Sequence, residues 1–284
     1  MKSSNIGGQA VMEGIMMRHK DKYSIAVRRP DNEIELKVED YKCVFGNAKF
    51  LKYPLIRGVV SFVDSLVVGT KCLMYSAEIA GDEEDEEDKQ KNAALSEEEL
   101  AAKKAKEDKQ FKWLLYVTVA VSIVVSVAAF MLLPYALASL CRRVGASEFA
   151  VTIVEAFVKL ALFMGYMLLI SRMKDIQRTF MYHGAEHKTI FCYEAEEKLT
   201  IENVRKFGRL HPRCGTNFLF LTMLVSIILF SLTGWGSFWQ RLILRIILTP
   251  IVAGITYEII KWLGRTESKL GKIIAYPGLK LQEL

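Results

Sequence analysis

The strongest constraint on this 284-residue chain is the run of residues 113–140, which contains no charged side chain. A helix of about 20 apolar residues crosses the hydrocarbon core of a bilayer. Residues 149–171, 218–234 and 242–263 form three further runs of this kind. Hydrophobic residues make up 51% of the chain, and the mean hydropathy is +0.19. We therefore predict a mainly α-helical, multi-pass membrane protein with about four transmembrane helices.

The positions of lysine and arginine predict the orientation in the membrane. They gather before the first run, in the loop 172–213 and after residue 263, whereas residues 235–240 contain none. The positive-inside rule then places both termini and this central loop in the cytoplasm. The net charge of +6 is thus explained by the membrane flanks. We expect no nucleic-acid partner, since no basic stripe with interleaved aromatic residues is present.

A fifth apolar run, residues 55–75, differs from the others because it contains Arg57, Asp64 and Lys71. These charges favour an amphipathic helix that lies on the membrane surface over one that spans it. We assign residues 48–80 to this interfacial helix.

The remaining segments complete the predicted organisation. Residues 1–47 form a small cytoplasmic β element, because residues 23–29 and 33–39 alternate apolar and polar side chains around the turn Pro30-Asp31-Asn32. Residues 81–112 form a charged, disordered linker that opens with the acidic block 82–88, and its segment 96–109 has the composition of a helix. The other predicted parts are two transmembrane helices (113–171), a cytoplasmic loop (172–216), two more transmembrane helices (217–263) and a cytoplasmic tail (264–284).

The histidines carry the clearest chemical signal. Three of the four lie between residues 183 and 211, and His183-Gly-Ala-Glu186-His187 has the form H-x-x-E-H. On a helix, side chains four residues apart share a face, so both imidazoles can bind one metal ion. Inverted zincin peptidases use this spacing, with the glutamate as general base. We therefore predict His183 and His187 as metal ligands and Glu186 as the catalytic base toward a metal-bound water.

A second short motif, His211-Pro-Arg-Cys214-Gly, lies at the other end of the same loop. It offers one nitrogen and one sulfur ligand, and with His183 and His187 these complete a tetrahedral zinc set. Four protein ligands would make a closed, structural site, whereas three would leave room for a water molecule. The spacing does not choose between these arrangements. A weaker alternative makes Cys214 a nucleophile with His211 or His187 as its base.

The glycine-rich segment 7–14 permits tight backbone geometry or close approach to a ligand. Gln9 and Glu13 are its polar residues, and Glu13 could supply a carboxylate to the metal centre. The favoured interpretation is a turn that leads into the first strand.

Charged residues inside the apolar runs are the last candidates. Glu155 and Lys159 stand four residues apart in the second run, and Arg245 and Glu258 lie in the fourth. Charge inside a membrane is costly and often marks a transport path. Pairing between helices is the favoured alternative.

Several motifs resemble those of the YqhQ-type bacterial membrane proteins. They are Gly-Gly-Gln-Ala-Val-Met-Glu-Gly-Ile-Met-Met-Arg at 7–18, His-Gly-Ala-Glu-His-Lys at 183–188, Leu-Thr-Ile-Glu-Asn-Val-Arg-Lys at 199–206, His-Pro-Arg-Cys-Gly-Thr at 211–216 and Tyr-Pro-Gly-Leu-Lys-Leu-Gln at 276–282. The resemblance covers nearly the whole chain. It implies a bacterial cytoplasmic-membrane protein of a family that is predicted to be metal-dependent.

Together these observations predict a membrane protein that binds a divalent metal, zinc by its ligand types, and acts as a metal-dependent hydrolase at the cytoplasmic face. The lipid bilayer is the one partner that we predict, and oligomer formation stays open. The alternatives are a non-enzymatic, metal-stabilised scaffold and a channel or transporter.

Overall fold

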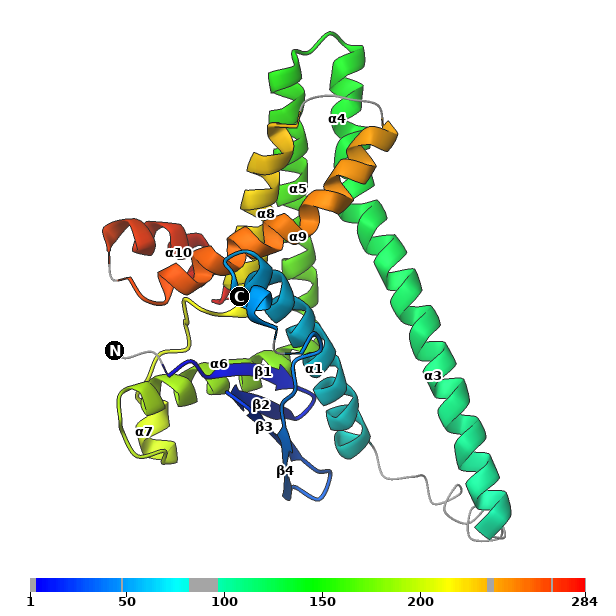
Figure 1. Cartoon of the computed structure of the whole chain (residues 1–284), viewed down its shortest axis with the longest axis vertical. Coiled ribbons are helices and arrows are strands. Elements are labelled where there is room, and N and C mark those ends of the chain that lie inside the picture. The colour runs from blue at the N-terminus through cyan, green and yellow to red at the C-terminus, as the bar shows by residue number, and fades with distance from the viewer. Residues whose placement is uncertain (1–3, 47, 82–96, 234–237, 267, 284) are drawn as a thin grey trace. The chain divides into compact units, whose positions relative to one another are not determined.

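The computed structural model describes residues 4–46, 48–81, 97–233, 238–266 and 268–283 (Figure 1). It divides into two compact units. The first combines Met1–Gly81 with Leu168–Leu284, and the second is Asp82–Met167. All residues of the predicted metal cluster belong to the first unit, so this unit is described in more detail.

The first unit begins with an antiparallel sheet whose strands follow chain order: β1 (Gly7–Val11), β2 (Gly14–His19), β3 (Lys22–Arg28) and β4 (Ile34–Asp40). The hairpin predicted from alternating residues is confirmed as β3–β4. Its turn contains Asn32 with φ of 68°, a conformation that asparagine tolerates well. The glycine-rich segment forms a second hairpin, β1–β2, rather than only a turn.

The first unit also contains a 3-10 turn and six α-helices in its described residues. They are the 3-10 turn η1 (Lys49–Lys52), α1 (Ile56–Ala80), α6 (Lys174–Glu194), α7 (Ile201–Arg205), α8 (Gly215–Ser231), α9 (Phe238–Leu263) and α10 (Lys269–Leu281). Of these, α1 and α6 pack on the sheet. The second unit holds α3 (Glu97–Val127), the π-helical turn η2 (Ala128–Leu132), α4 (Leu133–Arg143) and most of α5 (Glu148–Ile170).

Two helices cover opposite faces of the sheet (Figure 1). Successive residues of a strand point to opposite faces, and Gly8 of β1 lies against Glu186 of α6 while Gln9 lies against Gly69 of α1. On the α1 face, Val11, Ile25 and Val27 form a buried core that includes Val68 and Cys72 of α1. The sheet thus places its first strand beside the face of α6 that carries Glu186.

A second core joins the C-terminal helices. Leu221 of α8, Leu263 of α9 and Ala275 of α10 are buried against one another. Helix α1 crosses α9 closely at Gly58 and Gly254, where a Cβ atom on Gly58 would lie 2.9 Å from the Cα atom of Gly254. The crossing therefore needs glycine.

Among the described residues, four helical segments are long and apolar enough to cross a membrane: Ile56–Ala80, Tyr116–Arg143, Glu148–Ile170 and Leu242–Leu263. Several apolar helices of this kind, with the small sheet, agree with the predicted fold class. The segment predicted as an interfacial helix, α1, is also long and apolar enough to span. Helix α8, in the third predicted span, is apolar but has only 17 residues.

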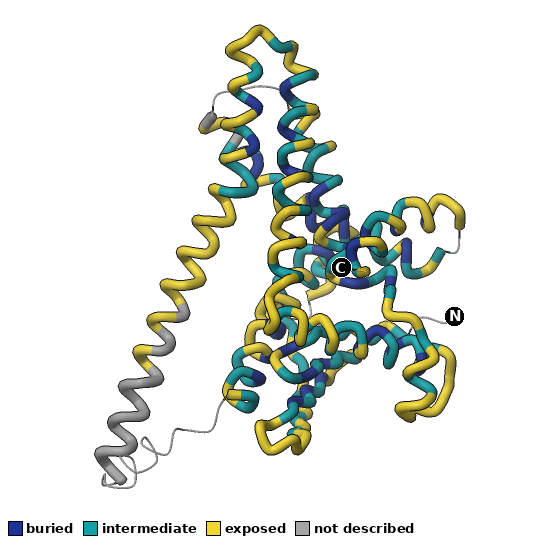
Figure 2. Tube along the Cα trace, turned by 180° about the vertical axis from the view of Figure 1, so that it is seen from behind, coloured by how far each residue is buried: buried dark blue, intermediate teal, exposed yellow. Residues whose placement is uncertain are grey.

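The second unit shows where the predicted linker meets the first span. Helix α3 begins at Glu97, so residues 97–112 are helical although they were assigned to the linker. Glutamate, alanine and lysine are all good helix formers, which explains this extension. The acidic block 82–88 lies outside the described residues. In Figure 2 the residues of α3 whose burial is described are coloured as exposed along the helix, as expected of an apolar helix that lipid surrounds.

Candidate metal centre

Helix α6 places the H-x-x-E-H residues on neighbouring turns. It runs without interruption through Gly184, where an added Cβ atom would meet only the Cβ atom of Arg209, at 3.8 Å. His183 and His187 are separated by one helical turn, and their ring centroids lie 4.4 Å apart. The predicted helical spacing of the two imidazoles is thus present in the structure.

Cys214 reaches the same place from a tight turn. The Cys214 backbone N–H donates to the carbonyl oxygen of His211, and Cys214 is the N-cap residue of α8. Its sulfur accepts a hydrogen bond from the backbone N–H of Thr216 at 3.4 Å. A helix N-terminus favours a negatively charged group, so this position stabilises a thiolate.

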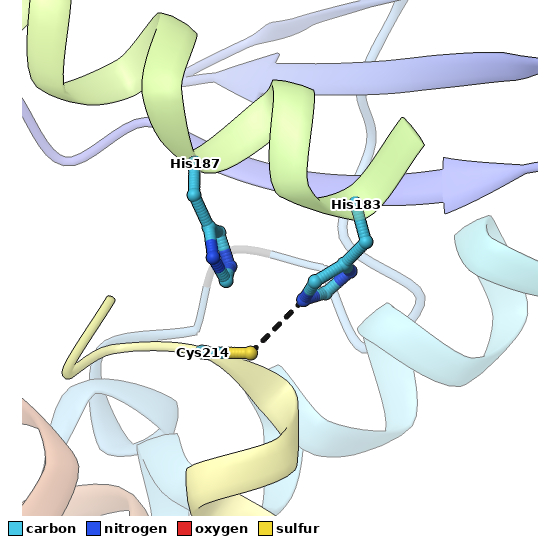
Figure 3. Close-up of side chains that lie close together, drawn as sticks. All are labelled: His183, His187 and Cys214. Carbon is cyan, nitrogen blue, oxygen red and sulfur yellow. Dashed lines mark hydrogen bonds between the residues drawn. The ribbon is translucent and has the colours of Figure 1, made fainter. Parts of the chain in front are cut away.

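The two histidines and the cysteine converge, as Figure 3 shows. One ligand atom from each of His183, His187 and Cys214 lies within 4.8 Å of the others. His183 Nε2 and Cys214 Sγ lie 3.0 Å apart. Two nitrogens and one sulfur are ligand types that zinc accepts.

The ring of His187 is held in one orientation. Its Nδ1 atom lies 2.5 Å from the backbone carbonyl oxygen of Arg209. A carbonyl oxygen only accepts, so Nδ1 carries the proton and the lone pair is on Nε2. Histidines that bind metals are commonly oriented by such a contact from the other ring nitrogen.

His211 lies beside the cluster but outside the three-residue group. Its ring packs against His187 and Phe191, with centroid distances of 5.3 and 4.7 Å. Its Nδ1 atom accepts from the backbone N–H of Arg213 at 3.2 Å, and its Nε2 atom lies 3.4 Å from the guanidinium of Arg213. Both nitrogens thus face Arg213, whereas the sequence motif predicted His211 as a fourth ligand.

Burial keeps the imidazoles uncharged at neutral pH. It lowers the pKa of His183 to about 4, with a smaller contribution from His187. Burial also lowers the pKa of His187, and together with Arg213 it lowers the pKa of His211 to about 3. Neutral imidazoles are the form that binds a metal ion. Burial raises the pKa of the Cys214 thiol, so a cation is needed for the thiolate to predominate.

Glu186 is a buried carboxylate beside the cluster. It is 3% exposed, and among the described residues its Oε2 atom has no hydrogen-bond partner. Oε2 lies 3.6 Å from Nδ1 of His183. Burial raises the pKa of Glu186 to about 7, so the protonated and ionised forms coexist near neutral pH. An unpartnered buried carboxylate is costly, and such groups often mark functional sites.

The two N-terminal candidates have other contacts. Gln9 points toward Gly69 of α1. Glu13 accepts two hydrogen bonds from the Arg178 guanidinium, at 2.6 and 2.8 Å, and one from the Tyr182 hydroxyl at 3.0 Å. Arg178 is the main cause of the lowered pKa of Glu13. In this structure the Glu13 carboxylate therefore joins β1–β2 to α6.

The charged residues of the apolar helices bear on the transport alternative. Glu155 and Lys159 of α5 are both buried. Glu258 of α9 is paired with Arg57 of α1, with Nε and Oε1 2.6 Å apart. For Glu258 this contact is the interhelical pairing that the sequence pattern favoured over a transport role.

Two contacts of the site could not be anticipated from the sequence. One is the carbonyl of Arg209, a residue 22 positions after His187 in the chain, which orients the His187 ring. The other is Gly8, whose missing side chain makes room for the Glu186 carboxylate: an added Cβ atom would lie 2.3 Å from Oε1. The glycine-rich pattern did indicate a close backbone approach, but it did not identify the partner.

Comparison with known proteins identifies relatives of the chain. The family model described as "Protein of unknown function (DUF1385)" matches residues 53–284. The "Uncharacterized protein YqhQ" of Bacillus subtilis (strain 168) is 35% identical, over 98% of this chain and 85% of its own length. No solved structure matches. These matches confirm the predicted resemblance to the YqhQ-type proteins.

Proposed function

We propose that this chain, which belongs to the DUF1385 family, is a membrane-bound hydrolase that depends on a divalent metal, with zinc preferred. His183, His187 and Cys214 would hold the ion. The observation that carries the proposal is the convergence of these three ligand atoms within 4.8 Å, beside the unpartnered Oε2 atom of Glu186.

The residues fit a zinc ion by their chemistry. The imidazoles are neutral, and the Nε2 lone pair of His187 is set by its contact with Arg209. Cys214 lies at a helix N-terminus, and a bound cation would offset the burial that raises the pKa of its thiol.

The number of ligands favours catalysis over a closed structural site. Catalytic zinc sites keep three protein ligands, whereas structural sites use four. When bound, a zinc ion supplies a Lewis acid that makes water a stronger nucleophile near neutral pH. Glu186 would take and return a proton at Oε2, because its pKa of about 7 lies near the working pH.

We place the protein in the bacterial cytoplasmic membrane, with both termini and the metal centre on the cytoplasmic side. The distribution of lysine and arginine supports this orientation. Cys214 stands at the start of α8, a 17-residue apolar helix. The metal centre would therefore lie close to the membrane surface.

A cysteine hydrolase is the second candidate, because one observation favours it. His183 Nε2 lies 3.0 Å from Cys214 Sγ, and His183 Nδ1 lies 3.6 Å from Glu186 Oε2. This order matches a nucleophile, a base and an orienting carboxylate. The base would then be His183, rather than the His211 or His187 considered from the sequence. Burial counts against it, because it raises the pKa of the thiol.

Elemental analysis of the detergent-purified full chain tests the proposal. We expect near-stoichiometric zinc in the wild type and in Glu186→Gln, and little in His187→Ala or Cys214→Ala. A closed scaffold site should tolerate Glu186→Gln in every assay, whereas a hydrolase should lose activity and keep its metal. Absence of metal after reconstitution with zinc, iron or manganese would overturn the metalloenzyme and leave the cysteine hydrolase.

A further inference from the structure

We infer that the C-terminal helix α10 is a clamp that positions the Cys214 turn, with Gln282 as its positioning residue. This inference rests on the proposed function for its purpose, since a loosely held Cys214 would bind a metal poorly.

Gln282 holds His211, the first residue of the Cys214 turn, through both the oxygen and the nitrogen of its side-chain amide. The His211 backbone N–H donates to Gln282 Oε1 at 2.8 Å, and Gln282 Nε2 donates to the His211 carbonyl oxygen at 3.0 Å. The carbonyl of His211 also accepts from the backbone N–H of Cys214. The side chain of Gln282 therefore fixes the same peptide groups that define the turn.

Helix α10 also supports Pro212, the next residue of the Cys214 turn, by packing against Asn217. Asn217 is fully buried, and its Nδ2 atom donates to the carbonyl oxygen of Pro212 at 2.7 Å. Gly278 of α10 packs directly on Asn217: an added Cβ atom would lie 1.9 Å from its Oδ1 atom. Close packing of α10 on Asn217 thus requires glycine at position 278.

The clamp also reaches the residue that orients His187. The guanidinium of Arg209 donates to the carbonyl oxygen of Glu283 at 3.2 Å, and the Arg209 carbonyl oxygen is the partner of His187 Nδ1. The end of α10 is therefore linked to both sides of the cluster, to Cys214 through Gln282 and to His187 through Arg209.

Packing of α10 depends on different residues from those that hold the turn. Ala275 is buried against Leu221 of α8 and Leu263 of α9, and Leu281 is also buried. Gln282 lies just after the helix and contributes hydrogen bonds to the turn. A substitution at Gln282 should therefore alter the turn without unpacking the helix.

The test is a cobalt(II) titration of the full-length protein in detergent, because cobalt substitutes for zinc and its thiolate charge-transfer absorption reports on Cys214. The variant is Gln282→Met, which keeps the length of the side chain and removes both hydrogen bonds. The matched control is Lys280→Met, which removes an exposed ion pair with Glu283 and a cation–π contact with Tyr276 but no hydrogen bond to His211. We expect cobalt affinity to fall about 10- to 100-fold in Gln282→Met, with a weaker charge-transfer band, and to be unchanged in Lys280→Met.

A second readout does not depend on metal. Cys214 is 4% exposed, so alkylation of the metal-free protein, followed by peptide mass spectrometry, reports how firmly its turn is held. We expect faster alkylation of Cys214 in Gln282→Met than in Lys280→Met, with equal rates at Cys192. Gln282→Glu keeps the acceptor for the His211 N–H and should lie between the two.

The outcomes separate the clamp from the proposed function. Equal cobalt affinity, spectrum and alkylation in Gln282→Met and Lys280→Met would overturn the clamp. Failure of the wild type to bind cobalt or zinc would overturn the metal site, while the alkylation rates would still decide the clamp. If Gln282→Met fails to fold, Gln282→Glu takes its place in both measurements, with the same comparison to Lys280→Met.

Discussion

Each side chain of the cluster is fixed by a different local contact. His183 and His187 share a helix face, His187 is oriented by the Arg209 carbonyl, and Cys214 caps α8. Helical periodicity predicted that His183 and His187 share a face, and the position of the H-x-x-E-H and H-x-x-C motifs at the ends of one loop indicated that they could meet. The motifs did not predict how the rings are oriented, since Arg209 and Gly8 are brought in by the tertiary fold.

The first residue-scale prediction concerns the number of ligands. His211→Asn should keep near-stoichiometric zinc, because both ring nitrogens of His211 face Arg213. His187→Asn should lose it, since His187 belongs to the three-residue group. Elemental analysis of the two variants, purified in parallel, makes the comparison. Equal loss of zinc in both would support the four-ligand site predicted from the sequence.

The second concerns Gly8 and Gly7, which are neighbours in β1 with different surroundings. A Cβ atom on Gly8 would lie 2.3 Å from Glu186 Oε1, whereas one on Gly7 would have nothing within 4 Å. Gly8→Ala should therefore displace the Glu186 carboxylate and lower hydrolysis at least tenfold with zinc retained, while Gly7→Ala should behave as the wild type. Measured zinc content and, once a substrate is found, turnover would show this. Full activity in Gly8→Ala would mean that the position of Glu186 is unimportant.

The third follows from the raised pKa of Glu186. The folded state holds this proton more tightly than the unfolded state, so the stability of the metal-free protein should fall as pH rises from about 4.5 to about 7. The loss should be up to about 3 kcal/mol, at 1.36 kcal/mol per pKa unit. Glu186→Gln cannot ionise and should lack this component.

Thermal unfolding midpoints in detergent at pH 5 and pH 8 test this for the metal-free proteins. The histidines with lowered pKa values make the folded protein more stable as pH rises. This contribution is common to both proteins and is removed when the two changes in midpoint are compared. The wild type should lose more stability than Glu186→Gln between the two pH values. An equal change in midpoint in the two proteins would show that the Glu186 carboxylate is not desolvated in the folded protein.

At the scale of elements, helix α1 shows where length and composition are insufficient. By these two criteria it can span a membrane. Its C-terminal half, however, packs on the sheet: Lys71 pairs with Glu39 at 2.6 Å, and the Tyr75 hydroxyl donates to Glu35 at 2.6 Å. A bilayer cannot surround a helix face that is covered by a sheet with charged side chains.

The two hairpins of the sheet differ in how far local sequence could predict them. The β3–β4 hairpin was predictable because alternation and a turn sequence are local signals. The β1–β2 hairpin was not predicted as strands, because glycine is a poor strand former. Its glycine at position 8 is explained by contact with α6, a helix more than 160 residues away in the chain.

The element-scale prediction is that both ends of α1 lie in the cytoplasm. Cysteines can be introduced at two exposed positions, Lys52 just before α1 and Glu78 in its last turn. A membrane-impermeant maleimide should label neither in intact cells and both after permeabilisation, over the background of the unmodified protein. Val144→Cys, in the 84% exposed position between α4 and α5, should be labelled in intact cells. Labelling of only one end of α1 in intact cells would show that it spans.

At the scale of the molecule, contacts among α1, α8 and α9 in the first unit indicate where the membrane surface should lie. Phe62 of α1 stacks on Phe218 near the start of α8, with centroids 5.8 Å apart. Arg57 of α1 pairs with Glu258 near the end of α9. The start of α1, the start of α8 and the end of α9 therefore lie together, and the sheet packs on the far half of α1. The membrane–water interface should therefore pass near the start of α1, the start of α8 and the end of α9.

The segment before α1 has the composition expected at that boundary. Lysines at 42, 49 and 52 alternate with exposed apolar and aromatic residues, namely Val44, Phe45, Phe50 and Tyr53. Aromatic residues favour the headgroup region, and lysines favour anionic lipid phosphates. The backbone of this segment is tied to α1, because the Val44 N–H donates to the buried Asp64 carboxylate at 2.9 Å.

We therefore expect Phe50 to sit among lipid headgroups in the membrane-inserted protein. Phe50→Cys labelled with an environment-sensitive fluorophore should emit at shorter wavelength and be quenched by nitroxide lipids in vesicles that contain anionic phospholipid. Glu33→Cys, in the exposed turn between β3 and β4, should report water and resist quenching, because the sheet packs on the half of α1 that lies beyond the boundary. Equal quenching at both sites would place the sheet at the membrane surface, and quenching at neither would move the boundary away from α1. Only the expected pattern puts the Cys214 turn, at the start of α8, within reach of both water and lipid.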